Sequence, residues 1–92
     1  MIFDEIDINI LKENFSEDLI NQINIENLEK IFNYLDENGV YYAKDLLLTS
    51  LDLFLLPHKI FIKKFEVLKN KLGENFIDDL GENSSLIEIM YE

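Results

Sequence analysis

The spacing of apolar residues indicates two long amphipathic helices, over Ile25 to Asn38 and Pro57 to Leu72. In both segments apolar positions recur every three or four residues, which places them on one face of an α-helix. These positions are Leu28, Ile31, Phe32 and Leu35 in the first segment, and Phe61, Phe65, Leu68 and Leu72 in the second. Gly39 and Gly73 follow the two segments, and a glycine there ends a helix readily because it adopts the left-handed backbone conformation.

Shorter helices are expected in the rest of the chain. They are a short helix after Ser16, then Tyr41 to Leu48, Leu51 to Leu56, Glu74 to Leu80 and Ser85 to Tyr91. Ser16 and Asn24 are expected N-caps, because their side chains accept hydrogen bonds from the free amides of a first helical turn. Ser85 and Glu88 have the spacing of a capping box, and Gly81 is expected to end the helix before them.

The beginning of the chain allows two interpretations. Ile6 to Ile10 alternates apolar and polar residues, which is the period of a half-buried strand. Ile2, Phe3, Ile6 and Ile10 also have the spacing of a helical stripe. A single strand needs a partner, such as a second copy of the chain, so we favour the helix.

Residues of the first long helix and of the segment after it recur 33 to 34 positions later. The first set is Phe32, Leu35, Gly39, Asp45 and Leu46, and the second is Phe65, Leu68, Gly73, Asp79 and Leu80. Repeated units of this length usually stack so that each buries the apolar face of its neighbour. The predicted fold is therefore all-α: one acidic helical domain over residues 1–92, a small bundle of about six short helices, with two loosely repeated helix-hairpin units and an N-terminal cap segment.

This pattern of helix, glycine turn and shorter helix resembles the helical repeats of the mitochondrial transcription termination factors, over roughly the last two-thirds of the chain. The resemblance implies stacked helical units. Those proteins hold nucleic acid with a basic concave face, which this acidic sequence lacks, so the resemblance extends to the stacking of helices and not to function.

Composition limits the class of protein. Ninety-two residues allow one hydrophobic core, and an apolar content of 48% is that of a chain that folds. No cysteine is present, which excludes disulfides, a thiolate nucleophile and a zinc site built on sulfur. The longest apolar run, Leu46 to Leu56, is shorter than the about twenty residues that span a membrane. Because the first residues are acidic and do not have the pattern of a secretory signal, we expect a cytoplasmic protein.

No group of residues indicates catalysis or a bound ion. His58 is the single imidazole, and the sequence indicates neither a carboxylate to orient it nor a nucleophile beside it. Asp36 to Gly39 has part of the pattern of a calcium loop, but Tyr34 occupies the first ligand position and Asp45 replaces the last glutamate. We therefore expect a protein that is not an enzyme and has no catalytic residue, cofactor or metal site.

Charge is the most informative property of the sequence. The formal net charge is −11, and acidic residues dominate on both sides of a lysine-rich stretch, residues 59–71, that carries +4. A negative domain opposes contact with phosphates, so direct binding of nucleic acid or of an anionic membrane is not expected. The lysines are expected to form the solvated side of the second long helix.

Two groups of acidic residues are candidates for a partner-binding surface. They are Asp4, Glu5, Asp7, Glu13, Glu17 and Asp18 near the start of the chain, and Glu74, Asp78, Asp79 and Glu82 near its end. Carboxylates presented in the way that nucleic acid presents its phosphates bind the basic surface of a larger protein, and the opposite charges speed association. The predicted function is therefore that of a small acidic inhibitor or regulator, a nucleic-acid mimic in the class of the anti-CRISPR proteins of phage and other mobile elements.

The apolar run Leu46 to Leu56 leaves two possibilities open. Its large side chains are difficult to bury in a domain of this size, so Leu51, Phe54 and Leu55 are candidate anchors of an exposed interface. The other possibility is a central helix surrounded by the rest of the bundle. Tyr41, next to the run, suits either the rim of an interface or the edge of the core, and so does Tyr42.

Self-association is the alternative function. A homodimer formed through Ile6 to Ile10 or through Leu46 to Leu56 would make the chain a structural or regulatory module. In that case the acidity serves only solubility.

Overall fold

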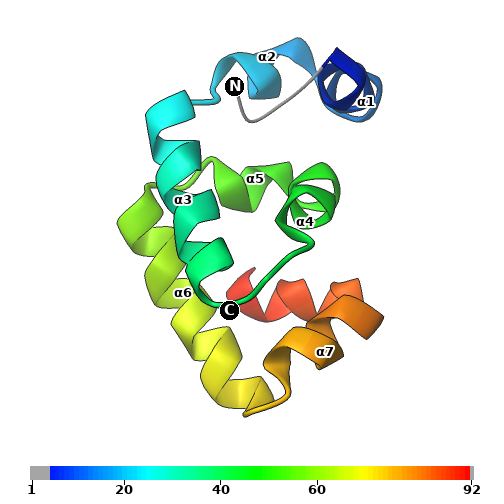
Figure 1. Cartoon of the computed structure of the whole chain (residues 1–92). Coiled ribbons are helices and arrows are strands. Elements are labelled where there is room, and N and C mark those ends of the chain that lie inside the picture. The colour runs from blue at the N-terminus through cyan, green and yellow to red at the C-terminus, as the bar shows by residue number, and fades with distance from the viewer. Residues whose placement is uncertain (1–4, 92) are drawn as a thin grey trace.

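Two long helices, α3 and α6, pack against each other and set the positions of the other elements (Figure 1). The computed structural model describes residues 5–91, apart from the side chain of Asp7. α3 spans Ile25–Glu37 and α6 spans His58–Leu72, as the apolar spacing predicts. Asn24 caps α3 with its side chain, which is also as predicted, whereas Pro57 precedes the first turn of α6 and does not belong to it.

Shorter helices complete the fold, and residues 5–91 contain no β-strand. They are α1 (Glu5–Asn14), α2 (Glu17–Asn21), α4 (Ala43–Thr49), α5 (Leu51–Phe54), α7 (Phe76–Glu82) and a 3₁₀ helix, η1 (Ser84–Tyr91). About six of these helices, α3 and α6 included, have seven or more residues, which confirms the predicted all-α bundle. Within the described residues, no helix combines the length and the apolar character that crossing a membrane requires.

The helices form two successive units of the same kind. The number of residues from the start of α3 to the start of α6 equals the number from the start of α4 to the start of α7. It also equals the number from the start of α5 to the start of η1. Gly39 and Gly73 follow the two long helices with φ angles of +84° and +82°. A residue with a side chain adopts such angles only under strain. The repeat that the sequence predicts is therefore present in the backbone, with α1 and α2 preceding the first unit.

The second unit differs from the sequence prediction at two positions. α7 continues through Gly81 to Glu82, and the ring of Tyr42 lies so close to Gly81 that a Cβ atom there would stand 3.2 Å from it. The role of this glycine is therefore close packing and not helix termination. Ser85 does not form a capping box: it lies inside η1, and its hydroxyl bonds to the side chain of Asn83.

The N-terminal segment is helical, but its apolar stripe differs from the predicted one. Ile6 to Ile10 lies within α1, which confirms the helical interpretation. Ile6 is 69% exposed, whereas Leu11 is buried. The face of α1 that meets the core is therefore the one that carries Leu11, because α1 lies across α4. Ile2 and Phe3, the other predicted members of the stripe, lie outside the described residues.

The core is built on aromatic rings from α5 and α6. Phe54, Phe61 and Phe65 are almost fully buried, and the ring centroids lie 5.0 Å apart for Phe54 and Phe61 and 6.0 Å apart for Phe61 and Phe65. Apolar residues of both units surround these rings: Leu28, Ile31, Leu35, Leu46, Leu47, Leu51, Leu53, Leu68, Leu80, Ile87 and Met90. The run Leu46 to Leu56 thus supplies much of the core, which is the central-helix possibility of the two that the sequence left open.

A single amide side chain fixes the connection between the two units. Asn27 on α3 accepts a hydrogen bond from the backbone N–H of His58 at 2.7 Å and donates one from Nδ2 to the carbonyl oxygen of Leu56 at 2.8 Å. The first N–H groups of a helix have no partner within that helix. Asn27 thus satisfies the first amide of α6 and ties the start of this helix to α3.

Replacing Asn27 is expected to destabilise the whole fold. Asn27→Ala leaves a part-buried carbonyl and a part-buried amide without these partners, and we expect the free energy of unfolding to fall by about 1–3 kcal/mol. Urea denaturation measures this change. Asn33→Ala, at an exposed position of the same helix, is the matched control and should change stability by less than about 0.5 kcal/mol. Equal effects of the two substitutions would contradict the assigned role of Asn27.

Candidate functional site

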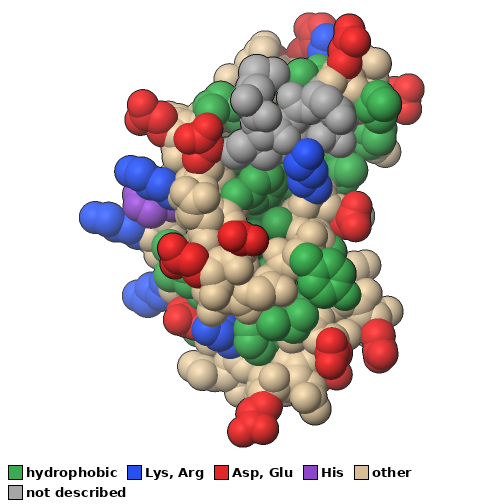
Figure 2. All heavy atoms as spheres, in the orientation of Figure 1, with side chains coloured by type: hydrophobic (Ala, Val, Ile, Leu, Met, Phe, Trp, Pro, Cys, Tyr) green, Lys and Arg blue, Asp and Glu red, His purple; other side chains and the backbone are tan. Residues whose placement is uncertain are grey.

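Charge is segregated in space as well as in sequence. Figure 2 shows lysine side chains and the histidine along the edge of the molecule where α6 lies, and carboxylates at both ends of the molecule. The principal extents are 36 × 25 × 24 Å, so the two ends are more than a Debye length apart at physiological salt, which is about 8 Å. The two acidic groups of residues are therefore two separate surfaces and not one.

The first acidic surface belongs to α1 and α2. Glu5 and Glu13 on α1 and Glu17 and Asp18 on α2 are all exposed. Glu17 and Asp18 occupy the first turn of α2, behind the N-cap Ser16, where negative charge is favourable because it opposes the helix dipole. Part of this surface thus also serves the helix. Asp4 lies outside the described residues, as does the side chain of Asp7.

The second acidic surface follows α7. Asp78 and Glu82 are exposed and lie four residues apart, on the same side of the helix. Glu74 is exposed in the turn before α7, whereas Asp79 is half-buried. Three carboxylates of this surface are therefore fully presented to solvent, and the fourth is partly withdrawn.

An exposed tyrosine stands beside this second surface. Tyr41 is 84% exposed, the highest value among the large apolar and aromatic side chains of residues 5–91. Its ring contacts that of Tyr42 edge to face, with centroids 5.0 Å apart. Tyr42 in turn lies on α7, where its hydroxyl donates a hydrogen bond of 2.6 Å to the carbonyl oxygen of Ile77. Tyr42 thus lies at the edge of the core, as the sequence allowed, and Tyr41 is exposed to solvent.

The apolar anchors predicted from the sequence are not surface residues. Leu51 is fully buried and Phe54 is 2% exposed, both inside the core, and Leu55 is half-buried against it. The physical reason is that α3, α4 and α6 pack around α5, so the apolar side chains of α5 are buried within the protein. Leu51 and Phe54 are therefore not available at the surface, whereas Tyr41 is exposed. A spacing argument does not reveal this exposure, because a single aromatic residue in a turn has no periodicity.

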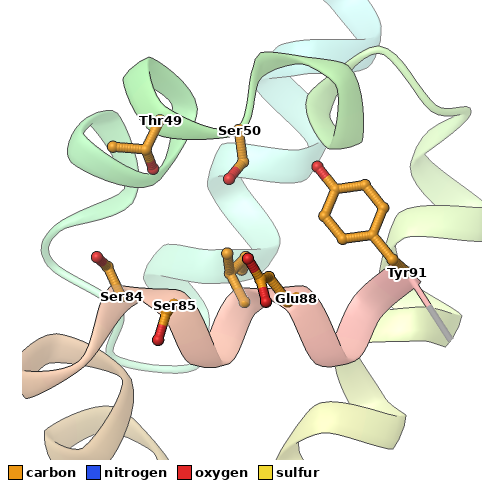
Figure 3. A pocket seen from close by; sticks show the side chains of 7 residues that line it. Thr49, Ser50, Ser84, Ser85, Glu88 and Tyr91 are labelled. Atoms are coloured by element: carbon orange, nitrogen blue, oxygen red, sulfur yellow. The ribbon is translucent and has the colours of Figure 1, made fainter.

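A hydroxyl-lined cleft lies between the α4–α5 junction and η1 (Figure 3). Its volume is about 250 Å³. Thr49 and Ser50 line one side, and Ser84, Ser85, Glu88 and Tyr91 line the other. The Tyr91 hydroxyl lies 2.7 Å from both carboxylate oxygens of Asp52 and joins the end of η1 to α5. This cleft brings serines together without an imidazole, because the one histidine of the chain begins α6.

His58 has a structural environment. Its Nδ1 lies 3.2 Å from Oδ1 of Asn27, the same atom that accepts from its backbone amide. Among residues 5–91, no three carboxylates or imidazoles converge in the way that a bound metal ion requires.

Comparisons of the chain with models of protein families, with curated proteins and with solved structures find no match.

Burial and nearby negative charge raise the pKa of Tyr42 to about 12. Burial is the largest cause, followed by the neighbouring Tyr41 and Asp78. An unfolded tyrosine ionises near pH 10, so between pH 10 and 12 the unfolded chain loses a proton that the folded chain keeps. The contribution of this group to stability is therefore complete below pH 10 and lost as the pH rises toward 12.

Tyr42→Phe is expected to change stability in a way that depends on pH. At pH 7 the variant loses the hydrogen bond to Ile77, and we expect its free energy of unfolding to be lower by about 1 kcal/mol. Between pH 10 and 12 this difference should shrink, because only the wild-type chain carries the Tyr42 hydroxyl. Urea denaturation at pH 7 and pH 11.5 measures both values, with Tyr41→Phe as the control for loss of an exposed hydroxyl. A difference that stays constant across this range would contradict the assignment.

Proposed function

We propose that the protein is a non-enzymatic binding module that docks the acidic surface of α7, with Tyr41 as its anchor, onto a basic surface of a larger protein. The observation that carries this proposal is the position of Tyr41, which is 84% exposed and contacts Tyr42, the residue that is hydrogen-bonded to α7 and close to Asp78. A basic surface that normally holds nucleic acid has the complementary charge. Such a module acts as a small acidic inhibitor or regulator, because it occupies the surface that the nucleic acid needs.

The two parts of this surface have different physical roles. An aromatic ring that moves from water into a pocket of the partner supplies much of the binding energy, and tyrosine is common among such anchors. Tyr41 is suited to this because its contact with Tyr42 restricts the ring before binding, which lowers the entropy lost on docking. The carboxylates of Asp78 and Glu82 steer the encounter and discriminate against acidic partners.

The acidic surface of α1 and α2 is the comparison surface. It carries exposed carboxylates but no exposed aromatic ring among the described residues. Charge alone attracts basic partners without much selectivity, and its effect is screened by salt. We therefore assign the specific contact to α7 and treat the opposite end of the molecule as a source of long-range negative charge.

Affinity capture from lysate of the native host, washed at low and at high salt, tests the proposal. We expect the wild-type chain to retain a nucleic-acid-binding protein at low salt and to release it at high salt or when that protein's own nucleic acid is added. Asp78→Lys with Glu82→Lys should abolish capture, because both substitutions repel a basic partner. Tyr41→Ala should weaken capture at least tenfold without changing the net charge, through the loss of a buried aromatic contact.

The matched control is Glu5→Lys with Glu13→Lys, which makes the same change in net charge at the other end of the molecule. It should leave capture largely intact. Equal losses from the two double variants would show that only net charge matters. Retention that is insensitive to salt and to Tyr41→Ala would contradict the proposal.

A further inference from the structure

The two units are held together by a regular contact between α3 and α6. Three pairs of side chains join these helices, each pairing a residue of α3 with the residue 31 positions later: Asn27 with His58, Tyr34 with Phe65, and Asn38 with Lys69. The first pair is a hydrogen bond to the start of α6, the second is an edge-to-face ring contact with centroids 5.8 Å apart, and the third joins Nζ to Oδ1 at 2.7 Å. α6 thus follows one continuous face of α3.

The equivalent face of α6 is uncovered. The two units are related by the number of residues between the start of α3 and the start of α6. At this separation, Ile60 corresponds to Asn27 and Val67 corresponds to Tyr34. These two residues are 43% and 46% exposed, and together with Lys63 and Lys64 they line a shallow groove of about 320 Å³. In repeat proteins each unit buries its stacking face against the next unit. Here that face carries apolar side chains and lysines and faces solvent.

The opposite end of the stack is partly uncovered. The counterparts of His58 and Phe65 on α3 are Ile25 and Phe32. Ile25 is 45% exposed, whereas Phe32 is half-buried, and its ring meets that of Phe54 edge to face with centroids 5.8 Å apart. The acidic residue between them in the helical row, Glu29, is exposed. α3 as a whole carries four carboxylates and one lysine, whereas α6 carries five lysines and one glutamate. The two uncovered faces are therefore opposite in charge and similar in apolar pattern.

We propose that the uncovered face of α6 binds the uncovered face of α3 from a second copy of the chain, in a head-to-tail contact that continues the repeat. Applying the observed α3–α6 pairing across two copies matches four pairs of residues: Ile60 with Ile25, Lys64 with Glu29, Val67 with Phe32, and Lys71 with Asp36. Two of these pairs are apolar and two join a lysine to a carboxylate. The spacing of the repeat and the observed α3–α6 pairing together determine each partner residue.

The physical balance favours a weak, reversible contact. Two copies with a net charge of −11 each repel at long range, but salt at 0.15 M screens this repulsion beyond about 8 Å. Groups in contact are screened much less, so the lysine–carboxylate pairs and the apolar burial act at short range. The surfaces that meet are different from each other, so every added copy presents a new free face and the product is an open chain, not a closed dimer.

Analytical ultracentrifugation at 0.15 M salt over a wide range of protein concentration tests this proposal. We expect the average mass of the wild-type chain to rise above 10.9 kDa and to pass the dimer mass without a plateau. Lys64→Glu disables the α6 face and Glu29→Lys disables the α3 face, because each places like charges opposite one another. Each variant alone should dissociate at least tenfold more readily than the wild type.

A mixture of the two variants separates head-to-tail stacking from other forms of association. The intact α3 face of the Lys64→Glu chain can pair with the intact α6 face of the Glu29→Lys chain, and the two substituted faces are also opposite in charge, so the mixture should associate again where each variant alone does not. A chain with both substitutions has exchanged charges and should associate again. Lys12→Glu and Glu17→Lys, which make the same charge changes on α1 and α2, are the matched controls and should behave as the wild type. Circular dichroism confirms that each variant is folded.

Three results would overturn the proposal. They are a wild-type chain that remains monomeric at all concentrations, a single variant that still associates as the wild type does, and a mixture of variants that stays monomeric. None of these substitutions touches Tyr41 or α7, so failure of the stacking contact and failure of the proposed partner-binding surface are distinguishable. A closed dimer through two α6 faces would persist in Glu29→Lys alone, which is the second of these results.

Discussion

The burial of one face of α6 is the constraint on which the rest of the fold depends. Phe61, Phe65 and Leu68 are all fully buried, and α3, α5, α7 and η1 each pack against this helix. Removing a buried aromatic side chain costs about 3–5 kcal/mol, which is a large part of the stability of a small domain. Phe61 contacts Phe54 of α5 and Phe65 contacts Tyr34 of α3, so this face joins the two units and each stabilises the other.

The same packing determines which surfaces remain for binding. Because α5 is enclosed, the most apolar part of the sequence is not available for contact. The surfaces that remain outside include the edge of α6, the outer side of α3, the α7 surface with Tyr41, and the acidic surface of α1 and α2. These surfaces differ in charge, so we assign them different partners: a basic protein for α7, and the complementary end of a second copy for α6. A single small domain can use both, since the surfaces do not overlap.

The sequence predicts the elements with regular spacing well and the elements without it poorly. The long helices, their glycine turns and the two-unit repeat follow from apolar spacing and from the backbone freedom of glycine. The prediction that Gly81 ends a helix was wrong because a glycine also allows close packing, here against the ring of Tyr42. The position of Ser85 depends on η1 being a 3₁₀ helix, and the tertiary contacts of this segment decide that, not its local pattern.

The surfaces could be predicted only in part for a related reason. Charge is visible in the sequence, so the acidic residues of α1, α2 and α7 are readily found, but composition does not show that they lie at opposite ends of the molecule. Whether Leu51 and Phe54 are exposed depends on how many elements surround α5, which no local pattern contains. Tyr41 becomes a candidate anchor only when its exposure and its neighbour Tyr42 are seen together. The stacking faces of α3 and α6 follow from the repeat once the pairing of these helices is known.

Native-state hydrogen exchange tests most directly whether the two units depend on each other. If the contact between α3 and α6 is the main source of stability, the slowest amides of both helices should exchange with the same opening free energy, equal to that of global unfolding. Asn27→Ala should then lower both values by the same amount. Exchange from α3 at a clearly lower opening free energy than from α6, or a loss of protection in one helix alone, would show that the units fold independently and would contradict this account.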